Sequence, residues 1–190
     1  MEADWEVEIG SDAPVIDACW TGFVDLRVAR DQASQLPEAR KFPALGDALV
    51  RLNSPYSPVW TVKSDVWHPD QFDPDELDAP AEAGKYAIAC YVDLLPRSDG
   101  QWPTPDAAIA ASKAICAGIA PAALRCCRAD LLVRRAFISP ARPVLGITAY
   151  LTACGSTLTE AAAVLASAIR VFVDVVVPSN VAAMQSSQLK

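Results

Sequence analysis

The sequence predicts an α+β fold of three consecutive ββα units, forming a mainly antiparallel sheet with the helices on one face. Three observations favour this fold. Three segments alternate in the manner of strands, a second strand pattern precedes each of them, and a helix pattern follows each of them. Self-similarity of this kind indicates an internal repeat, with units at about 4–54, 58–121 and 124–177.

The second strand of each unit carries the clearest similarity. These strands are predicted at residues 20–26, 88–94 and 147–153. Each has an aromatic residue at its fourth position, in turn Phe23, Tyr91 and Tyr150. Because side chains alternate between the two faces of a sheet, we expect these three aromatic residues to share one face.

The first strand of each unit is shorter and contains an acidic position. The three patterns are Glu6–Ile9, Lys63–Val66 and Arg128–Leu131. The alternation of side chains predicts that Lys63 and Arg128 lie on the same face as the aromatic residues, together with the acids Asp65 and Asp130.

A helix pattern closes each unit. The first covers about 44–53 after Pro43, and the second begins at Thr104, an N-cap followed by a proline. The third opens with a capping box at Thr157–Glu160 and runs to about Val177. This last helix is apolar nearly all the way round, which predicts burial on more than one side and is one reason to expect a partner.

The same elements fit a second arrangement, a ferredoxin-like βαββαβ sheet with extra elements. The order of the patterns does not distinguish the two arrangements, since both are α+β with an antiparallel-rich sheet and helices on one face. In either case residues 1–178 are predicted to form a single domain, and residues 179–190 are predicted to be a disordered tail.

The helix-free face of the sheet is the predicted binding face, with Phe23, Tyr91, Tyr150, Lys63 and Arg128 as its candidate residues. A solvated sheet face seldom repeats an aromatic residue at each equivalent position. Three explanations remain open: the rings form a small core or cross-strand ladder, a self-association surface, or a ligand or catalytic site.

Four carboxylates are weak catalytic candidates: Asp25, Asp65, Asp93 and Asp130. Paired carboxylates perform acid–base catalysis or hold a divalent cation, but an acid also recurs wherever it ends a strand or caps a turn. The single histidine, His68, and the lack of any CxxC pair predict no metal site. No phosphate-binding glycine motif and no GxSxG motif are present, so no cofactor is predicted.

The net charge is −7 and the pI is about 4.6, which argues against nucleic acid and anionic membranes as partners. The acidic first residues differ from a signal peptide, and the least charged stretch, Pro143–Thr159, is too short and polar to span a bilayer. The sequence therefore predicts a cytoplasmic protein.

Two functional hypotheses follow. The first is a non-catalytic cytoplasmic binding or interaction protein that self-associates as a homodimer, with a protein partner or small ligand as a further occupant of the sheet face. The second is a small carboxylate-based enzyme, acid–base or dependent on a divalent metal ion, with its site on the same face. The lack of catalytic motifs favours the first.

Overall fold

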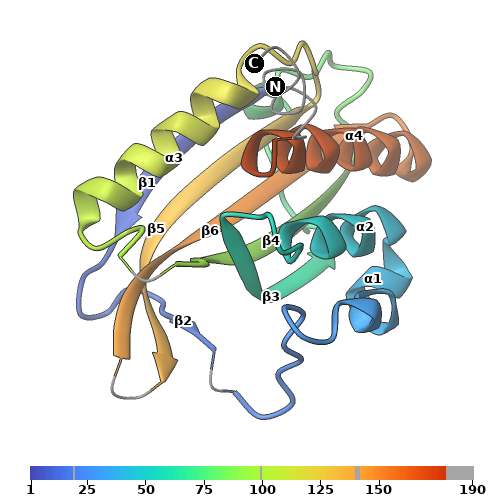
Figure 1. Cartoon of the computed structure of the whole chain (residues 1–190). Helices are drawn as coiled ribbons and strands as arrows, with labels where there is room; N and C mark the ends of the chain where they lie inside the picture. Colours follow the sequence, from blue (N-terminus) through green and yellow to red (C-terminus); the bar gives the residue numbers. More distant parts are fainter. Residues whose placement is uncertain (19, 99, 140–141, 179–190) are drawn as a thin grey trace, which may run out of the picture.

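The computed structural model describes residues 1–18, 20–98, 100–139 and 142–178, and Figure 1 shows helices packed above a sheet. The strands are β1 (Glu2–Glu8), β2 (Ile16–Asp17), β3 (Val59–Trp67), β4 (Tyr86–Pro96), β5 (Cys127–Ser139) and β6 (Arg142–Gly155). The helices are η1 (Arg30–Gln35), α1 (Pro37–Lys41), α2 (Pro43–Leu52), η2 (Asp75–Leu77), α3 (Pro105–Ile119) and α4 (Leu158–Val176), with η marking 3-10 helices. The predicted disordered tail, 179–190, lies outside the described residues.

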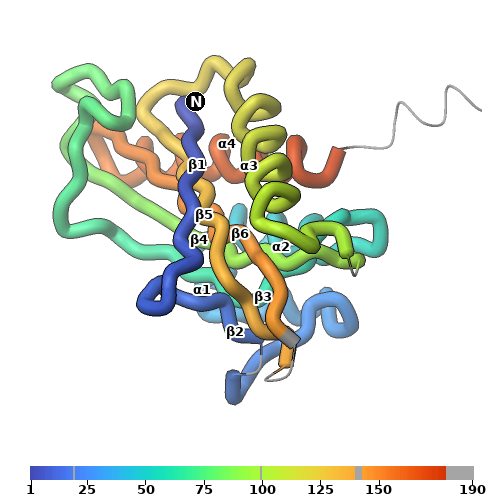
Figure 2. Tube along the Cα trace, turned by 90° about the vertical axis from the view of Figure 1, so that its left-hand side faces the viewer, coloured from blue at the N-terminus to red at the C-terminus, as the bar shows by residue number. Residues whose placement is uncertain are grey.

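The fold is α+β with a mainly antiparallel sheet, as predicted. The strand order is β1-β5-β6-β4-β3, and β2 pairs separately with β5. Strands β3, β4, β6 and β5 are antiparallel neighbours, whereas β1 and β2 run parallel to β5. Figure 2 shows β1 lying along β5, which comes much later in the chain.

The second and third predicted hairpins form, and the first does not. Strand β3 pairs with β4 before α3, and β5 pairs with β6 before α4. The first predicted hairpin is wrong, because β1 pairs with β5 and the segment 20–26 contains no strand. The three-unit repeat is therefore not confirmed, although α2 follows close to its predicted position.

Local geometry explains why the segment 20–26 is a loop. Gly22 has a φ of 90°, in the left-handed region that interrupts an extended chain. The backbone N–H of Phe23 donates to the carbonyl oxygen of Trp20 at 3.3 Å and closes a first turn. The Asp25 carboxylate accepts from the backbone N–H of Arg27 at 2.9 Å, which makes an Asx-turn. The alternating pattern of this segment thus belongs to two successive turns.

The ferredoxin-like alternative is not confirmed either, because the order of elements along the chain differs. From β4 to α4 the chain runs βαββα, and β6 lies between β4 and β5, which gives a split βαβ arrangement. The strand on the other side of β4 is β3. Strand β3 comes before β4 in the chain, whereas the corresponding strand of a βαββαβ chain would come last.

The main core lies between the sheet and the helices. It includes the alternate residues of β4 and β6 that point away from Tyr91 and Tyr150, namely Ile88, Cys90, Val92, Leu94, Ile147, Ala149, Leu151 and Ala153. Helix α4 packs on β6 and β4 and contacts α2 and α3, and Ala168 at its centre is fully buried. The chain itself covers this apolar helix, so the helix gives no reason to expect a partner.

Candidate functional site

The sheet face opposite α2, α3 and α4 carries a cluster of three aromatic rings. No α-helix of the described residues covers this face, and we keep the name helix-free face for it, although the 3-10 helix η2 packs at its end through Leu77 against Ala87 and Cys154. Tyr91 and Tyr150 share this face, as predicted, and they are directly opposite each other on β4 and β6, with ring centroids 5.9 Å apart. Trp67, the last residue of β3, lies 6.2 Å from the Tyr91 ring and 6.4 Å from the Tyr150 ring. We call these three residues the ring cluster. Its tyrosines are half-buried, and Trp67 is 36% exposed.

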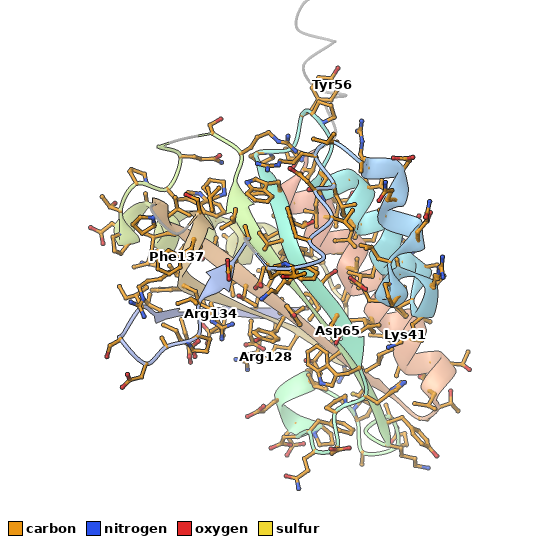
Figure 3. All side chains as sticks on the ribbon, turned by 90° about the horizontal axis from the view of Figure 1, so that it is seen from below. Lys41, Tyr56, Asp65, Arg128, Arg134 and Phe137 are labelled. Carbon is orange, nitrogen blue, oxygen red and sulfur yellow. The ribbon has the colours of Figure 1, made fainter. Side chains whose placement is uncertain are left out.

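Carboxylates flank the ring cluster on both sides. The register places Asp65 of β3 beside Tyr91, and Asp130 of β5 beside Tyr150. The Asp65 carboxylate accepts from the backbone N–H of Val66 at 2.7 Å. On the opposite side, Arg128 pairs with Asp130 at 2.7 Å; Figure 3 looks onto this face and labels Asp65 and Arg128 at its two sides. Each side of the rings therefore presents charge.

Phe23 lies on the helix-free side but belongs to a different cluster. It packs edge-on against Trp60 of β3, with ring centroids 6.2 Å apart, in a small core that includes Leu95 and Ala136. The loop 20–29 supplies this contact by crossing the sheet, which Figure 3 shows as the pale blue segment in front of the strands. The prediction that Phe23 is a strand residue of the same sheet face as the two tyrosines is therefore wrong. Phe23 belongs to a loop, and the loop carries its ring to the helix-free side.

A partly buried chain of polar side chains crosses four strands beside the ring cluster. Arg134 of β5 donates to Glu8 of β1 at 2.7 Å and to the hydroxyl of Thr148 on β6 at 3.2 Å. The Thr148 hydroxyl donates to the Asp93 carboxylate on β4 at 2.6 Å. Arg134 also donates to the hydroxyl of Tyr150 at 3.3 Å, which links the chain to the rings. These bonds fix the strands and the Tyr150 ring relative to one another.

Asp93 is the most buried of the four candidate carboxylates, at 6% exposure. Burial raises its pKa, while the Thr148 hydrogen bond and the positive charges of Arg134 and Lys63 lower it in part. Burial, followed by the negative charges of Asp93 and Asp65, raises the pKa of Tyr91 to about 12. The Tyr91 hydroxyl thus stays protonated at neutral pH.

The substitution Asp93→Asn is expected to change how stability depends on pH. Because the folded pKa of Asp93 is raised above the unfolded value of about 3.9, the folded state holds the proton more tightly. The stability that this group contributes is present at low pH and is lost as the pH rises above about 4. The variant lacks this loss. Urea denaturation should show its free energy of unfolding rising, relative to the native protein, between about pH 4 and about pH 7. A difference that stays constant or falls contradicts the assignment.

The four candidate carboxylates have separate partners. Asp25 forms an ion pair with Arg27 at 2.7 Å, which lowers its pKa, and it lies on the loop rather than on a strand. Asp65, Asp93 and Asp130 are held by Val66, Thr148 and Arg128 as described above. Within the described residues there is no group of three or more His, Cys, Asp or Glu side chains arranged to hold a metal ion.

A cavity of about 540 Å³ opens beside the ring cluster, and we call it the edge cavity. Trp20 and Val24 of the loop, Glu38 of α1 and Leu49 of α2 form three of its sides. The fourth side is residues 61–64 of β3, and Tyr91 closes it toward the ring cluster. Two of the predicted binding-face residues, Lys63 and Tyr91, therefore line a concave space.

Sequence reasoning missed Trp67 and Trp20 as residues of this site. Trp67 has the same alternation as Lys63 and Asp65 on its strand, so extending that strand by one residue places it on the helix-free face. The place of Trp20 had no such signal, because it depends on how the loop crosses the sheet.

No helix in the described part of the chain combines the length and the hydropathy needed for a membrane span. Comparisons of the sequence and structure with protein-family models, curated proteins and solved structures give no match.

Proposed function

We propose that this protein is a non-catalytic binding protein that self-associates as a homodimer through the helix-free face of its sheet. The observation that carries the proposal is the partly exposed ring cluster at the middle of that face. Large aromatic side chains at the centre of a surface patch, with charges around them, are typical of protein interfaces. Tryptophan and tyrosine supply much of the binding energy at such interfaces.

The charges around the rings suit a two-fold arrangement. Asp65 lies on the β3 side of the ring cluster, and Arg128 lies on the β5 side. A two-fold axis along the strands, between Tyr91 and Tyr150, exchanges these sides and brings Asp65 of each copy toward the Arg128–Asp130 ion pair of the other. Closed two-fold dimers are the commonest symmetric assemblies, and they require this self-complementarity.

The substitution Trp67→Glu is expected to convert the dimer to a monomer at micromolar concentration. It removes the most exposed ring of the cluster and places a charge at the centre of the interface, which costs about 2 kcal/mol or more, roughly 30-fold in affinity. Light scattering should give twice the chain mass for the native protein and a mass near 20.2 kDa for the variant.

Tyr56→Glu is the matched control, because Tyr56 is 82% exposed and does not belong to the ring cluster. It introduces the same charge in place of an aromatic ring and should leave the dimer intact. A native mass near 20.2 kDa would show that the proposal is wrong. So would a Trp67→Glu dimer as stable as the native one.

The carboxylate-enzyme hypothesis keeps one supporting observation, the buried Asp93 with its raised pKa. The residues lining the edge cavity include none of Asp25, Asp65, Asp93 and Asp130. A catalytic carboxylate has to reach its substrate, so the geometry favours the binding function. A cytoplasmic location and the absence of nucleic acid and membrane partners remain part of the proposal.

A further inference from the structure

We infer that the edge cavity binds a small organic anion with an apolar body, independently of self-association. Its volume of about 540 Å³ lies within the range of small-molecule sites, roughly 300–1,000 Å³. Most of the side chains that line it are apolar or aromatic, and a few are polar. This composition is typical of sites that bury a ligand's body and orient it through one or two polar contacts.

The free edge of β3 forms the polar wall. Four consecutive residues, 61–64, line the cavity. Because neighbouring residues of a strand point to opposite faces, this lining includes the strand's edge, and β3 is the last strand of the sheet. The register with β4 shifts between Thr61 and Ser64, and bulges of this kind re-aim side chains near binding sites. Lys63 lies within this irregular step.

Among the polar groups of this wall, Lys63 is the one that carries a charge, and that charge has no ion-pair partner in the part of the chain that the structure describes, although it also acts on Asp93. The Ser64 hydroxyl donates to Glu38 at 2.9 Å, and the Thr61 hydroxyl accepts from Asn53 at 2.7 Å. Among the described residues, no carboxylate lies within 4.0 Å of the Lys63 ammonium. The cavity therefore offers an ammonium group that a ligand's anionic group can pair with.

An aromatic surface lies next to this ammonium group. The Lys63 Nζ is 6.0 Å from the centroid of the Trp20 ring, and both residues line the cavity. Val24 and Leu36 continue the apolar wall. A ligand with an aromatic or aliphatic body can pack against Trp20 while its anionic group meets Lys63, so both features of the cavity specify the same class of ligand.

The test uses two dyes of nearly equal shape. The anion 8-anilinonaphthalene-1-sulfonate carries a sulfonate on an aromatic body, and N-phenyl-1-naphthylamine is its uncharged analogue. Fluorescence titration of the native protein should show one saturable site for the anionic dye. Lys63→Gln is expected to lower the affinity for the anionic dye by about 10-fold or more, and to change the affinity for the uncharged dye by less than about two-fold.

The control variants locate the site. Lys85→Gln removes an exposed lysine just before β4 and should change the affinity for neither dye. Val24→Trp and Leu36→Trp fill the edge cavity from two different walls, and each should abolish binding of both dyes in a protein that still unfolds cooperatively. Trp67→Glu should leave the dye affinity unchanged, which separates this site from the proposed dimer interface.

Three results would overturn the inference. The first is the absence of saturable binding to the native protein. The second is an anionic-dye affinity that Lys63→Gln leaves unchanged. The third is loss of binding in Trp67→Glu together with native binding in folded Val24→Trp and Leu36→Trp, because that result places the dye on the ring cluster.

Discussion

Replacement of Trp60 by alanine is expected to lower the free energy of unfolding by about 3–5 kcal/mol. Trp60 is 2% exposed and is among the largest fully buried side chains of the described residues. Its indole N–H donates to the carbonyl oxygen of Pro96 at 3.1 Å. The alanine variant loses the buried ring and leaves a cavity on the helix-free side. Urea denaturation measures the change.

The same substitution is expected to release the loop 20–29 from the sheet. The Arg27 guanidinium lies 3.7 Å from the centroid of the Trp60 ring, and the Phe23 ring packs against it edge-on. Without the indole both contacts are lost, so trypsin should cleave after Arg27 faster than in the native protein. Tyr56→Ala, at a highly exposed ring, should stay within about 0.5 kcal/mol of native stability. A loss below about 1 kcal/mol in Trp60→Ala contradicts this role.

Prediction from the sequence succeeded for two central strands of the sheet and failed for the segment that packs on Trp60. The strands around 88–94 and 147–153 were predicted with the correct alternation, because a long antiparallel strand with one face in the core carries a strong period of two. That alternation placed Tyr91 and Tyr150 on one face, whereas their direct pairing depends on the strand order, which the sequence left open. The segment 20–26 has a similar pattern, but Gly22 and Asp25 form turns there, and its contact with Trp60 is tertiary.

Two features depend on contacts between distant parts of the chain. The parallel pairing of β1 with β5 joins strands that are far apart in the sequence, and nothing in the local pattern of either strand indicates its partner. The edge cavity needs the loop, α1, α2 and the irregular step in β3 at the same place. Lys63 was predicted as a binding residue, but the cavity beside it could not be predicted from its neighbours in the sequence.

The substitution Asn53→Ala is expected to cost about 2–4 kcal/mol of stability, because it leaves buried polar groups without partners. Asn53 follows α2 and is 1% exposed. Its amide donates to the carbonyl oxygen of Leu49 at 2.8 Å and to the Thr61 hydroxyl at 2.7 Å. Its carbonyl oxygen accepts from the backbone N–H of Thr61 at 3.0 Å. The side chain thus joins the end of α2 to the free edge of β3.

A double-mutant cycle with Thr61→Val tests whether this joint is the cause. Thr61→Val removes only the hydroxyl contact and should cost about 1 kcal/mol. Once Asn53 is alanine, the Thr61 hydroxyl has lost that partner, so the second substitution should cost less than it does in the native protein, with a coupling of about 0.5–3 kcal/mol. Purely additive costs would show that the hydrogen bond between the Asn53 amide and the Thr61 hydroxyl contributes no stability.

The alanine variant also leaves the backbone N–H of Thr61 unpaired, and an unpaired edge strand invites pairing with another chain. Faster aggregation of Asn53→Ala than of Thr61→Val, at equal fractions unfolded, is therefore expected from the same contact.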